Sequence, residues 1–260
     1  SRPASRSSLI QAVVLTDSKR DSIWTSNLSE QRRSKTAFFR QAGVIMNNYY
    51  TIADKAEASF TEKRSEFIGY IAPVTTNDEA VRFIESIREK HRKATHNVYA
   101  YILRNDNISR YSDDGEPQGT AGIPVFDVLR KRNLTDVCIV VTRYFGGILL
   151  GGGGLVRAYS HCASIACDSA EIMNMCHCTR INISVDYSVY GKISYIIPRY
   201  EVITVSSDFG DKINLELLVT DESRENLFKE LVNISNGNIT IEYKEELFED
   251  FSSVKNKNSS

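Results

Sequence analysis

The residue types best suited to chemistry gather in an acidic loop, at the end of an apolar run, and in a run of glycines. The loop supplies three carboxylates, the apolar run ends in an arginine, and the glycines precede an expected helix. Glycines let backbone N–H groups turn toward a ligand, and a helix N-terminus carries about half a positive charge. The pattern predicts an anion-binding site made of Asp113, Asp114, Glu116, Arg143, Gly151, Gly152, Gly153, Gly154 and Arg157.

Two interpretations of Arg143 stay open from the residues alone. Arg143 either binds the anion of a ligand, or it clamps a loop carboxylate and so fixes the loop. An Asp-Asp-Gly-Glu-Pro run such as residues 113–117 is also an ordinary solvated turn. The strand that ends at Arg143 places it at a carboxyl edge, where open α/β sheets usually hold ligands.

The ligand interpretation leads to one alternative function, an enzyme that acts on a phosphate ester. Arg143 and the glycine helix start would hold the phosphate, and the acidic loop would bind Mg²⁺. His96 is the one candidate acid or base. A lone histidine is more often a capping or packing residue, so an enzyme is the less favoured expectation.

Known catalytic and metal motifs are missing from the sequence. There is no Gly-Lys-Ser/Thr phosphate loop, no dinucleotide fingerprint and no Gly-x-Ser-x-Gly elbow. The five cysteines lack paired metal spacing, so they are expected to be reduced thiols, without a resident metal or cofactor. Mg²⁺ is expected as a cofactor only under the alternative that the protein is an enzyme acting on a phosphate ester.

Hydrophobic periodicity changes its order near residues 174–178. Before that point strands are expected over 56–61, 66–73, 98–103, 108–112 and 137–142, with helices after Thr76, after Pro124 and from Leu155 to about Met173. After it, strands are expected over 181–185, 201–205, 213–219 and 239–243, with helices over 189–197 and 222–232. The second order is β-α-β-β-α-β, which is typical of a ferredoxin-like domain.

The two ends of the chain differ from this body. Residues 1–45 carry eight Lys or Arg against three acids and show no periodicity, so they are expected to be a disordered or non-native extension. Domains are expected at 46–175 and 176–250, followed by a flexible tail at 251–260. Residues 46–260 hold 24 basic against 30 acidic residues, which disfavours strong non-specific RNA binding. No apolar run is long enough to span a bilayer, so a cytoplasmic protein is expected.

Several long motifs resemble the IMPACT (YigZ-type) family. They are Ser112-Asp113-Asp114-Gly115-Glu116-Pro117, Gly119-Thr120-Ala121-Gly122, Val141-Thr142-Arg143-Tyr144-Phe145-Gly146-Gly147 and Gly153-Gly154-Leu155-Val156-Arg157-Ala158-Tyr159. Shorter matches at residues 63–69 and 94–97 support them. With the β-α-β-β-α-β tail, they identify the bacterial two-domain form of the family.

The resemblance implies an α+β protein with a ribosomal protein S5 domain 2-like N-terminal domain. It implies a ferredoxin-like C-terminal domain similar to the last domain of elongation factor G. Eukaryotic relatives are linked to control of translation during amino-acid starvation, through protein–protein contact. The expected function is a non-enzymatic regulator of translation or stress response that binds nucleic acid, the ribosome or a protein partner.

Overall fold

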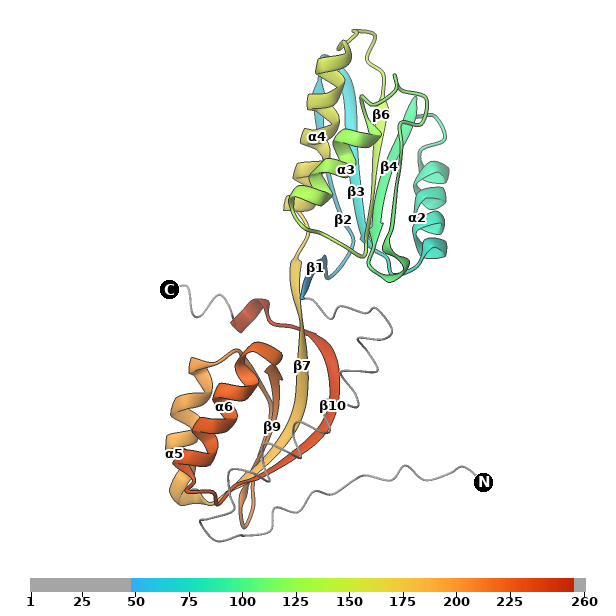
Figure 1. Ribbon diagram of the computed structural model, residues 1–260. Coiled ribbons are helices and arrows are strands. Elements are labelled where there is room, and N and C mark those ends of the chain that lie inside the picture. The colour runs from blue at the N-terminus through green and yellow to red at the C-terminus, as the bar shows by residue number, and fades with distance from the viewer. Residues whose placement is uncertain (1–47, 255–260) are drawn as a thin grey trace, which may run out of the picture. The chain divides into compact units, whose positions relative to one another are not determined.

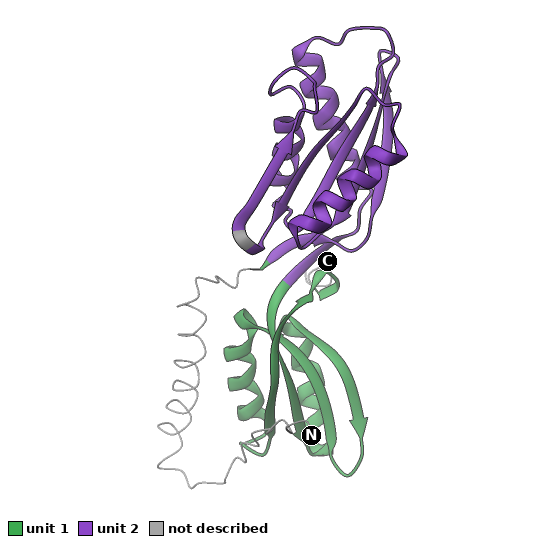
Figure 2. Cartoon of the chain, turned by 90° about the vertical axis from the view of Figure 1, so that its right-hand side faces the viewer, with its two compact units in different colours: residues 1–48, 176–260 green, residues 49–175 purple. Residues whose placement is uncertain are grey.

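The computed structural model describes residues 48–254, which form two compact units. Tyr49–Met175 make one unit, and Asn48 with residues 176–254 belong to the other (Figure 2). The expectation for residues 1–45 lies outside the described residues. None of the described helices is long and apolar enough to cross a membrane.

The first unit is built on a five-stranded antiparallel sheet in the order β2-β3-β6-β4-β5. Helix α2 covers one face of this sheet, and α3 and α4 cover the other (Figure 1). The elements are β1 (Tyr49–Ile52), β2 (Ala56–Glu62), β3 (Ser65–Pro73), α2 (Asn77–Lys90), β4 (His96–Leu103), η1 (Asn105–Asn107), β5 (Ile108–Ser112), α3 (Gly122–Lys131), β6 (Val137–Tyr144) and α4 (Gly152–Asp168).

Strand β6 lies at the centre of this sheet, between β3 and β4. All of its residues but Tyr144 are buried, as the apolar β-branched run predicts. Its side chains alternate between two cores, since Ile139 packs with residues of α3 and α4, whereas Val140 packs with residues of α2. Helix α4 packs closely on β3, because a Cβ at Gly69 would lie 2.9 Å from Cβ of Ala166.

The antiparallel pairing corrects one step of the sequence argument. Carboxyl ends of strands meet at one edge only in a parallel sheet, and β6 runs antiparallel to both of its neighbours. Arg143 therefore lies beside the start of β4 at His96 and beside Phe67 near the start of β3. The expected helix from Leu155 to about Met173 is also shorter, since α4 ends at Asp168 and a strand begins at Ile172.

The second unit has the predicted β-α-β-β-α-β order, and its strands are arranged β10-β7-β9-β8. Both helices cover one face of this sheet (Figure 1). The first residues of β7, 172–175, pair with β1 and belong to the first unit. The elements are β7 (Ile172–Val185), α5 (Tyr187–Ile196), η2 (Ile197–Arg199), β8 (Val202–Phe209), β9 (Ile213–Thr220), α6 (Asp221–Ile234) and β10 (Thr240–Asp250).

The expectation of a flexible tail at 251–260 is wrong for its first residues. Phe251 is fully buried and packs in a small apolar cluster with Cys176, Cys178 and Leu218. Residues 252–254 continue as a short helical turn, and residues 255–260 lie outside the described range. The aromatic side chain of Phe251, directly after β10, thus anchors a segment whose polar composition predicted a flexible tail.

All five cysteines are free thiols with buried side chains: Cys138, Cys162, Cys167, Cys176 and Cys178. Burial raises the pKa of the Cys162 thiol to about 12 and that of Cys167 to about 11. Within residues 48–254 no group of three or more His, Cys, Asp or Glu side chains is placed to hold a metal ion.

Candidate functional site

Arg143 forms a buried ion pair with Glu116. Its Nη1 lies 2.5 Å from Oε1 of Glu116, and the two side chains are only 6% and 3% exposed. Tyr159, from α4, donates a hydrogen bond of 2.8 Å to the same carboxylate oxygen. Burial and then the negative Glu116 raise the pKa of the Tyr159 hydroxyl, which therefore stays protonated and able to donate.

The neighbours of Arg143 come from the two adjoining strands. Phe67 and His96 pair with it in register, so the three side chains share the face that α3 and α4 cover. The guanidinium carbon lies 5.5 Å from the ring centroids of both Phe67 and Phe145. Within the described residues its Nε has no hydrogen-bond partner, although it is buried. The arrangement has the geometry of a clamp between β6 and the acidic loop.

Asp113 organises the acidic loop from within. One carboxylate oxygen accepts the backbone N–H groups of Ala121 and Gly122 at 3.1 and 2.8 Å, and the other accepts that of Gly119 at 2.9 Å. Burial by itself would raise the pKa of Asp113, but these three hydrogen bonds outweigh it and lower the pKa. Asp113 thus holds the start of α3 against the end of β5.

Asp114 ties the loop to α2 and β4. Its carboxylate lies 3.0 Å from Nη2 of Arg88 and accepts the backbone N–H of Asn97 at 2.6 Å. Nδ1 of His96 is hydrogen-bonded to the backbone oxygen of Asp114 at 2.8 Å, and its Nε2 lies 3.7 Å from Oε1 of Glu116. Each of the three loop carboxylates therefore has partners within the protein, which leaves this donor set a poor match for Mg²⁺.

The glycine run begins helix α4 at the surface. Gly151 has a φ of +73°, and its carbonyl oxygen accepts the N–H of Leu155 at 2.9 Å. Gly152 lies beside the end of the acidic loop, since a Cβ there would be 3.9 Å from Cγ2 of Thr120. Gly151, Gly152 and Gly153 are exposed, whereas Gly154 is half-buried.

Arg157 is exposed on the first turns of α4, and its guanidinium lies back toward Gly153. No hydrogen bond or ion pair within residues 48–254 joins it to Arg143 or to the three loop carboxylates. The structure thus brings Arg143, Glu116, His96 and Asp114 together in one network, in which Arg143 and Glu116 are buried and His96 and Asp114 are half-buried. Arg157 and the glycines lie outside this network, on the neighbouring surface.

Sequence reasoning missed the apolar surface of the loop between β6 and α4. Phe145, Ile148 and Leu149, here called the tip, are 46%, 41% and 81% exposed. The signal was present as an apolar triplet, Ile148-Leu149-Leu150, enclosed by glycines. The loop leaves the sheet at the upper end of β6 in Figure 1.

Exposed basic side chains occur in the segments that adjoin the tip loop. Lys63 and Arg64 form the β2–β3 turn with positive φ values, and a Cβ at Gly146 would overlap the backbone of Arg64 at 2.0 Å. The exposed basic residues contributed by the adjoining segments are Lys63, Arg64, Arg92, Lys93 and Arg157. Glu62 and Glu66 are the acids in the same hairpin. Five exposed basic residues therefore lie in segments next to the apolar tip.

Two family models match the chain: the Impact N-terminal domain over residues 63–167, and a domain of unknown function, DUF1949, over residues 183–238. The IMPACT family member YvyE of Bacillus subtilis is 37% identical over 195 residues, covering 74% of this chain and 89% of that protein. YigZ of Escherichia coli is 29% identical over 182 residues, covering 69% and 89%. The protein IMPACT of Rattus norvegicus is 34% identical over 98 residues, covering 36% of this chain and 31% of the rat protein.

A crystal structure described only as that of a hypothetical protein aligns with 77% of this chain and 99% of its own, at 27% identity and a TM-score of 0.49. The chain is a mixed α/β protein of two units. The first unit contains the buried Arg143–Glu116 ion pair and a glycine-rich loop. With both family models and the Bacillus relative in place, the chain belongs to the IMPACT family. Membership of this family implies a regulatory role.

Proposed function

We propose that this protein is a non-enzymatic regulator of translation or stress response that acts by binding a protein partner through the tip. The observation that carries the proposal is the exposure of Leu149, 81%, in one loop with two other exposed apolar residues, Phe145 and Ile148. Single exposed leucines are ordinary, but apolar side chains that gather on one short loop are typical of an interaction site.

The loop is anchored where it leaves the sheet, which lowers the entropy cost of binding. The backbone N–H of Phe145 donates to Oγ1 of Thr95 at 3.1 Å, and that of Gly146 donates to Oγ of Ser65 at 3.2 Å. Arg143, two residues before Phe145, forms the buried ion pair with Glu116. In this proposal the candidate residues Arg143, Asp113, Asp114 and Glu116 position the loop between β6 and α4, which carries the tip. Arg157 and the glycines at 151–154 border the binding surface.

The chemistry of the tip suits an acidic protein segment with an apolar face. Ile148 and Leu149 would enter an apolar pocket of the partner, and the surrounding basic residues would meet its carboxylates. Of the three tip residues only Phe145 offers a ring on which a base could stack, whereas Ile148 and Leu149 are aliphatic. The second unit, residues 176–254, carries seven basic and 14 acidic residues, and its net charge of −7 opposes a nucleic-acid backbone. These two observations favour a protein over RNA.

The phosphate-ester enzyme is the second candidate, and the geometry favours it less. It requires free carboxylates for Mg²⁺ and an accessible arginine for phosphate. Asp113, Asp114 and Glu116 are each engaged by protein donors, and Arg143 is 6% exposed in its side chain. No step of such a reaction can be assigned to these residues as they stand.

The test compares the full chain with Leu149→Glu and with a matched control, Val205→Glu, on an exposed position of β8. Tagged proteins are used to recover partners from cell extract, with and without ribonuclease, and bound proteins are quantified by mass spectrometry. The same three proteins are added to a cell-free translation extract, and the rate of protein synthesis is measured.

We expect a protein recovered by the full chain and by Val205→Glu, lost with Leu149→Glu, and unaffected by ribonuclease. The effect on protein synthesis should follow the same order. Equal recovery with Leu149→Glu, or complete loss after ribonuclease treatment, would contradict the proposal, and the second result would indicate RNA as the partner.

A further inference from the structure

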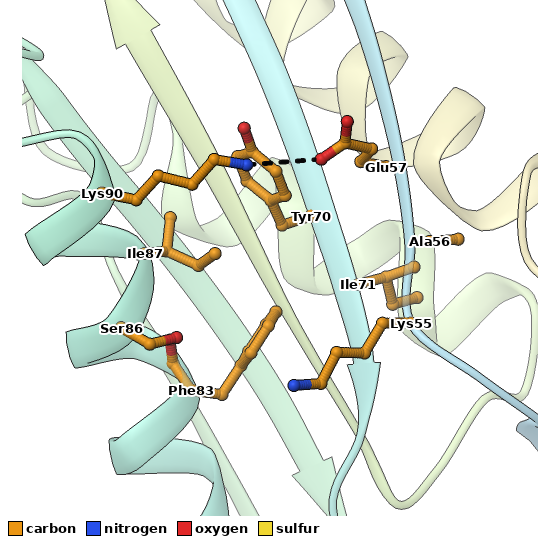
Figure 3. Close-up of a pocket in the computed structure, with 9 residues that line it drawn as sticks. All are labelled: Lys55, Ala56, Glu57, Tyr70, Ile71, Phe83, Ser86, Ile87 and Lys90. Carbon is orange, nitrogen blue, oxygen red and sulfur yellow. Dashed lines mark hydrogen bonds and ion pairs between the residues drawn. The ribbon is translucent and has the colours of Figure 1, made fainter.

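A separate slot lies on the face of the first unit's sheet that α2 covers, between α2 and strands β2 and β3 (Figure 3). The slot is open to solvent and has a volume of about 350 Å³, at the lower end of the range for small-molecule sites. Its floor is formed by buried residues, Tyr70, Ile71, Phe83 and Ile87. Its rim is formed by exposed polar ones, Lys55, Glu57, Ser86 and Lys90.

The two lysines of the rim differ in their partners. Nζ of Lys90 lies 4.5 Å from the ring centroid of Tyr70 and 3.5 Å from a carboxylate oxygen of Glu57. Nζ of Lys55 lies 5.8 Å from the ring centroid of Phe83, and no carboxylate within the described residues pairs with it. Figure 3 shows the two side chains at opposite ends of the slot, with Ile71 and Ile87 between them. The rim therefore carries one uncompensated positive charge.

Hydrogen bonds hold Tyr70, an aromatic residue of the slot's floor, in place. The hydroxyl of Tyr70 is hydrogen-bonded to Nε2 of His91 at 2.8 Å, and Nδ1 of His91 is hydrogen-bonded to the hydroxyl of Tyr144 at 2.9 Å. Tyr70 and His91 are both buried. A side chain held in this way does not need to be ordered when a ligand enters the slot, which lowers the entropy cost of binding.

We propose that the slot is a binding site for a small monocarboxylate with a flat apolar body. The apolar body would lie on Phe83 and Ile87, and the carboxylate would pair with Lys55. The single net charge of the rim selects a monoanion over a neutral molecule or a cation. The site is on the α2 face, away from the tip, so it does not depend on the proposed protein partner.

The experiment uses three compounds of nearly equal shape: 3-phenylpropionate, 3-phenylpropionamide and 3-phenylpropylammonium. Binding to the full chain is measured by titration in two-dimensional NMR, which also locates the affected residues. The variants are Lys55→Gln, which removes the charge and keeps most of the side chain, and Ser86→Phe, which fills the mouth of the slot. Lys131→Gln, at an exposed lysine at the end of α3 and outside the slot, is the matched control. Thermal melts check that each variant is folded.

We expect 3-phenylpropionate to bind with a Kd below about 1 mM, shifting signals from residues 55–57, 70–71 and 83–90. Lys55→Gln should weaken this binding by about fivefold, as the loss of one partly exposed charge pair predicts. Ser86→Phe should abolish it, Lys131→Gln should not change it, and the amide and the ammonium should bind more weakly.

Three results would overturn the proposal: equal binding of the neutral amide, undiminished binding by folded Lys55→Gln, or shifts outside the slot. Failure of 3-phenylpropionate to bind at about 10 mM would overturn it as well. The Leu149→Glu protein should retain the full affinity, so this proposal and that of the protein partner can fail independently.

Discussion

Nη1 of Arg143 and Oε1 of Glu116 are 2.5 Å apart in the interior of the first unit, and the Tyr159 hydroxyl donates to the same carboxylate oxygen. Three segments distant in sequence therefore meet at one atom: the end of β6, the acidic loop and the second turn of α4. A buried pair of this kind depends on both members, because either one left alone is a charge without solvent or partner.

Removing Arg143 should destabilise the first unit strongly. Arg143→Ala leaves Glu116 buried with only Tyr159 as a full hydrogen-bond partner, and we expect a loss of about 3 kcal/mol or more in the free energy of unfolding. Urea denaturation followed by circular dichroism measures the loss. Arg157→Ala, at an exposed position of the same region, is the control and should change stability by less than about 0.5 kcal/mol. Unchanged stability of Arg143→Ala together with lost affinity for phosphate or RNA would instead support a ligand-binding arginine.

Asp113→Asn should weaken the acidic loop in a manner that depends on pH. The neutral amide accepts fewer and weaker hydrogen bonds from the N–H groups of Gly119, Ala121 and Gly122, so we expect a loss of about 2 kcal/mol at pH 7. The native pKa of Asp113 is lowered, so its contribution is present above the unfolded value of about 4 and is lost as pH falls further. Melting curves of both proteins should therefore converge as the pH drops below about 4. A difference that stays constant would show that charge is not the cause.

The first unit should also lose stability on mild acidification because of His91. Burial, followed by the nearby charge of Lys90, lowers the pKa of this histidine, against weaker opposing effects of Glu66 and Glu57. Protonation thus favours the unfolded chain, and stability falls as pH decreases below about 6.5, the ordinary histidine value. His91→Gln removes the titration, so its melting temperature should change less than that of the unaltered protein between about pH 7 and 5. Parallel curves for the two proteins would rule His91 out.

Two adjacent glycines of the tip loop should respond differently to the same substitution. A Cβ at Gly146 would overlap the backbone of Arg64 at 2.0 Å, so Gly146→Ala must displace the β2–β3 turn. We expect about 3 kcal/mol of destabilisation from it, and reduced binding at the tip. Gly147 has a φ of +83° and open space around it, so Gly147→Ala should cost about 1 kcal/mol of backbone strain. Denaturant titrations rank the two, and a reversed order would contradict this account.

The element order of the second unit could be predicted because each element shows its own period. Ile181, Ile183 and Val185 alternate and are all buried in β7, while Leu227 and Leu231 recur at helical spacing in α6. The start of β7 was less visible. Residues 172–178 mix polar and sulfur-containing side chains, and their strand form depends on pairing with β1, which is distant in sequence.

The site was predicted in its residues but not in its geometry. Glycine spacing and the acidic run showed where unusual backbone lies, yet a carboxylate that binds a ligand and one that binds its own loop have the same sequence. Asp113 accepts three backbone N–H groups from residues six to nine positions further along, a distance over which no local rule operates. The slot was equally hidden, because Lys55 and Phe83 meet only through the packing of α2 on the sheet.

The reaction rate of the five buried thiols with a thiol reagent should report how fast the surrounding structure opens. A thiol reagent needs contact with solvent-exposed sulfur, and Cys138, Cys162, Cys167, Cys176 and Cys178 are all buried in the folded chain. Modification can then proceed only as fast as the surrounding structure opens. Three of these cysteines belong to the unit of residues 49–175 and two to the other, so mass-resolved labelling would time the opening of each unit separately in a single unaltered molecule.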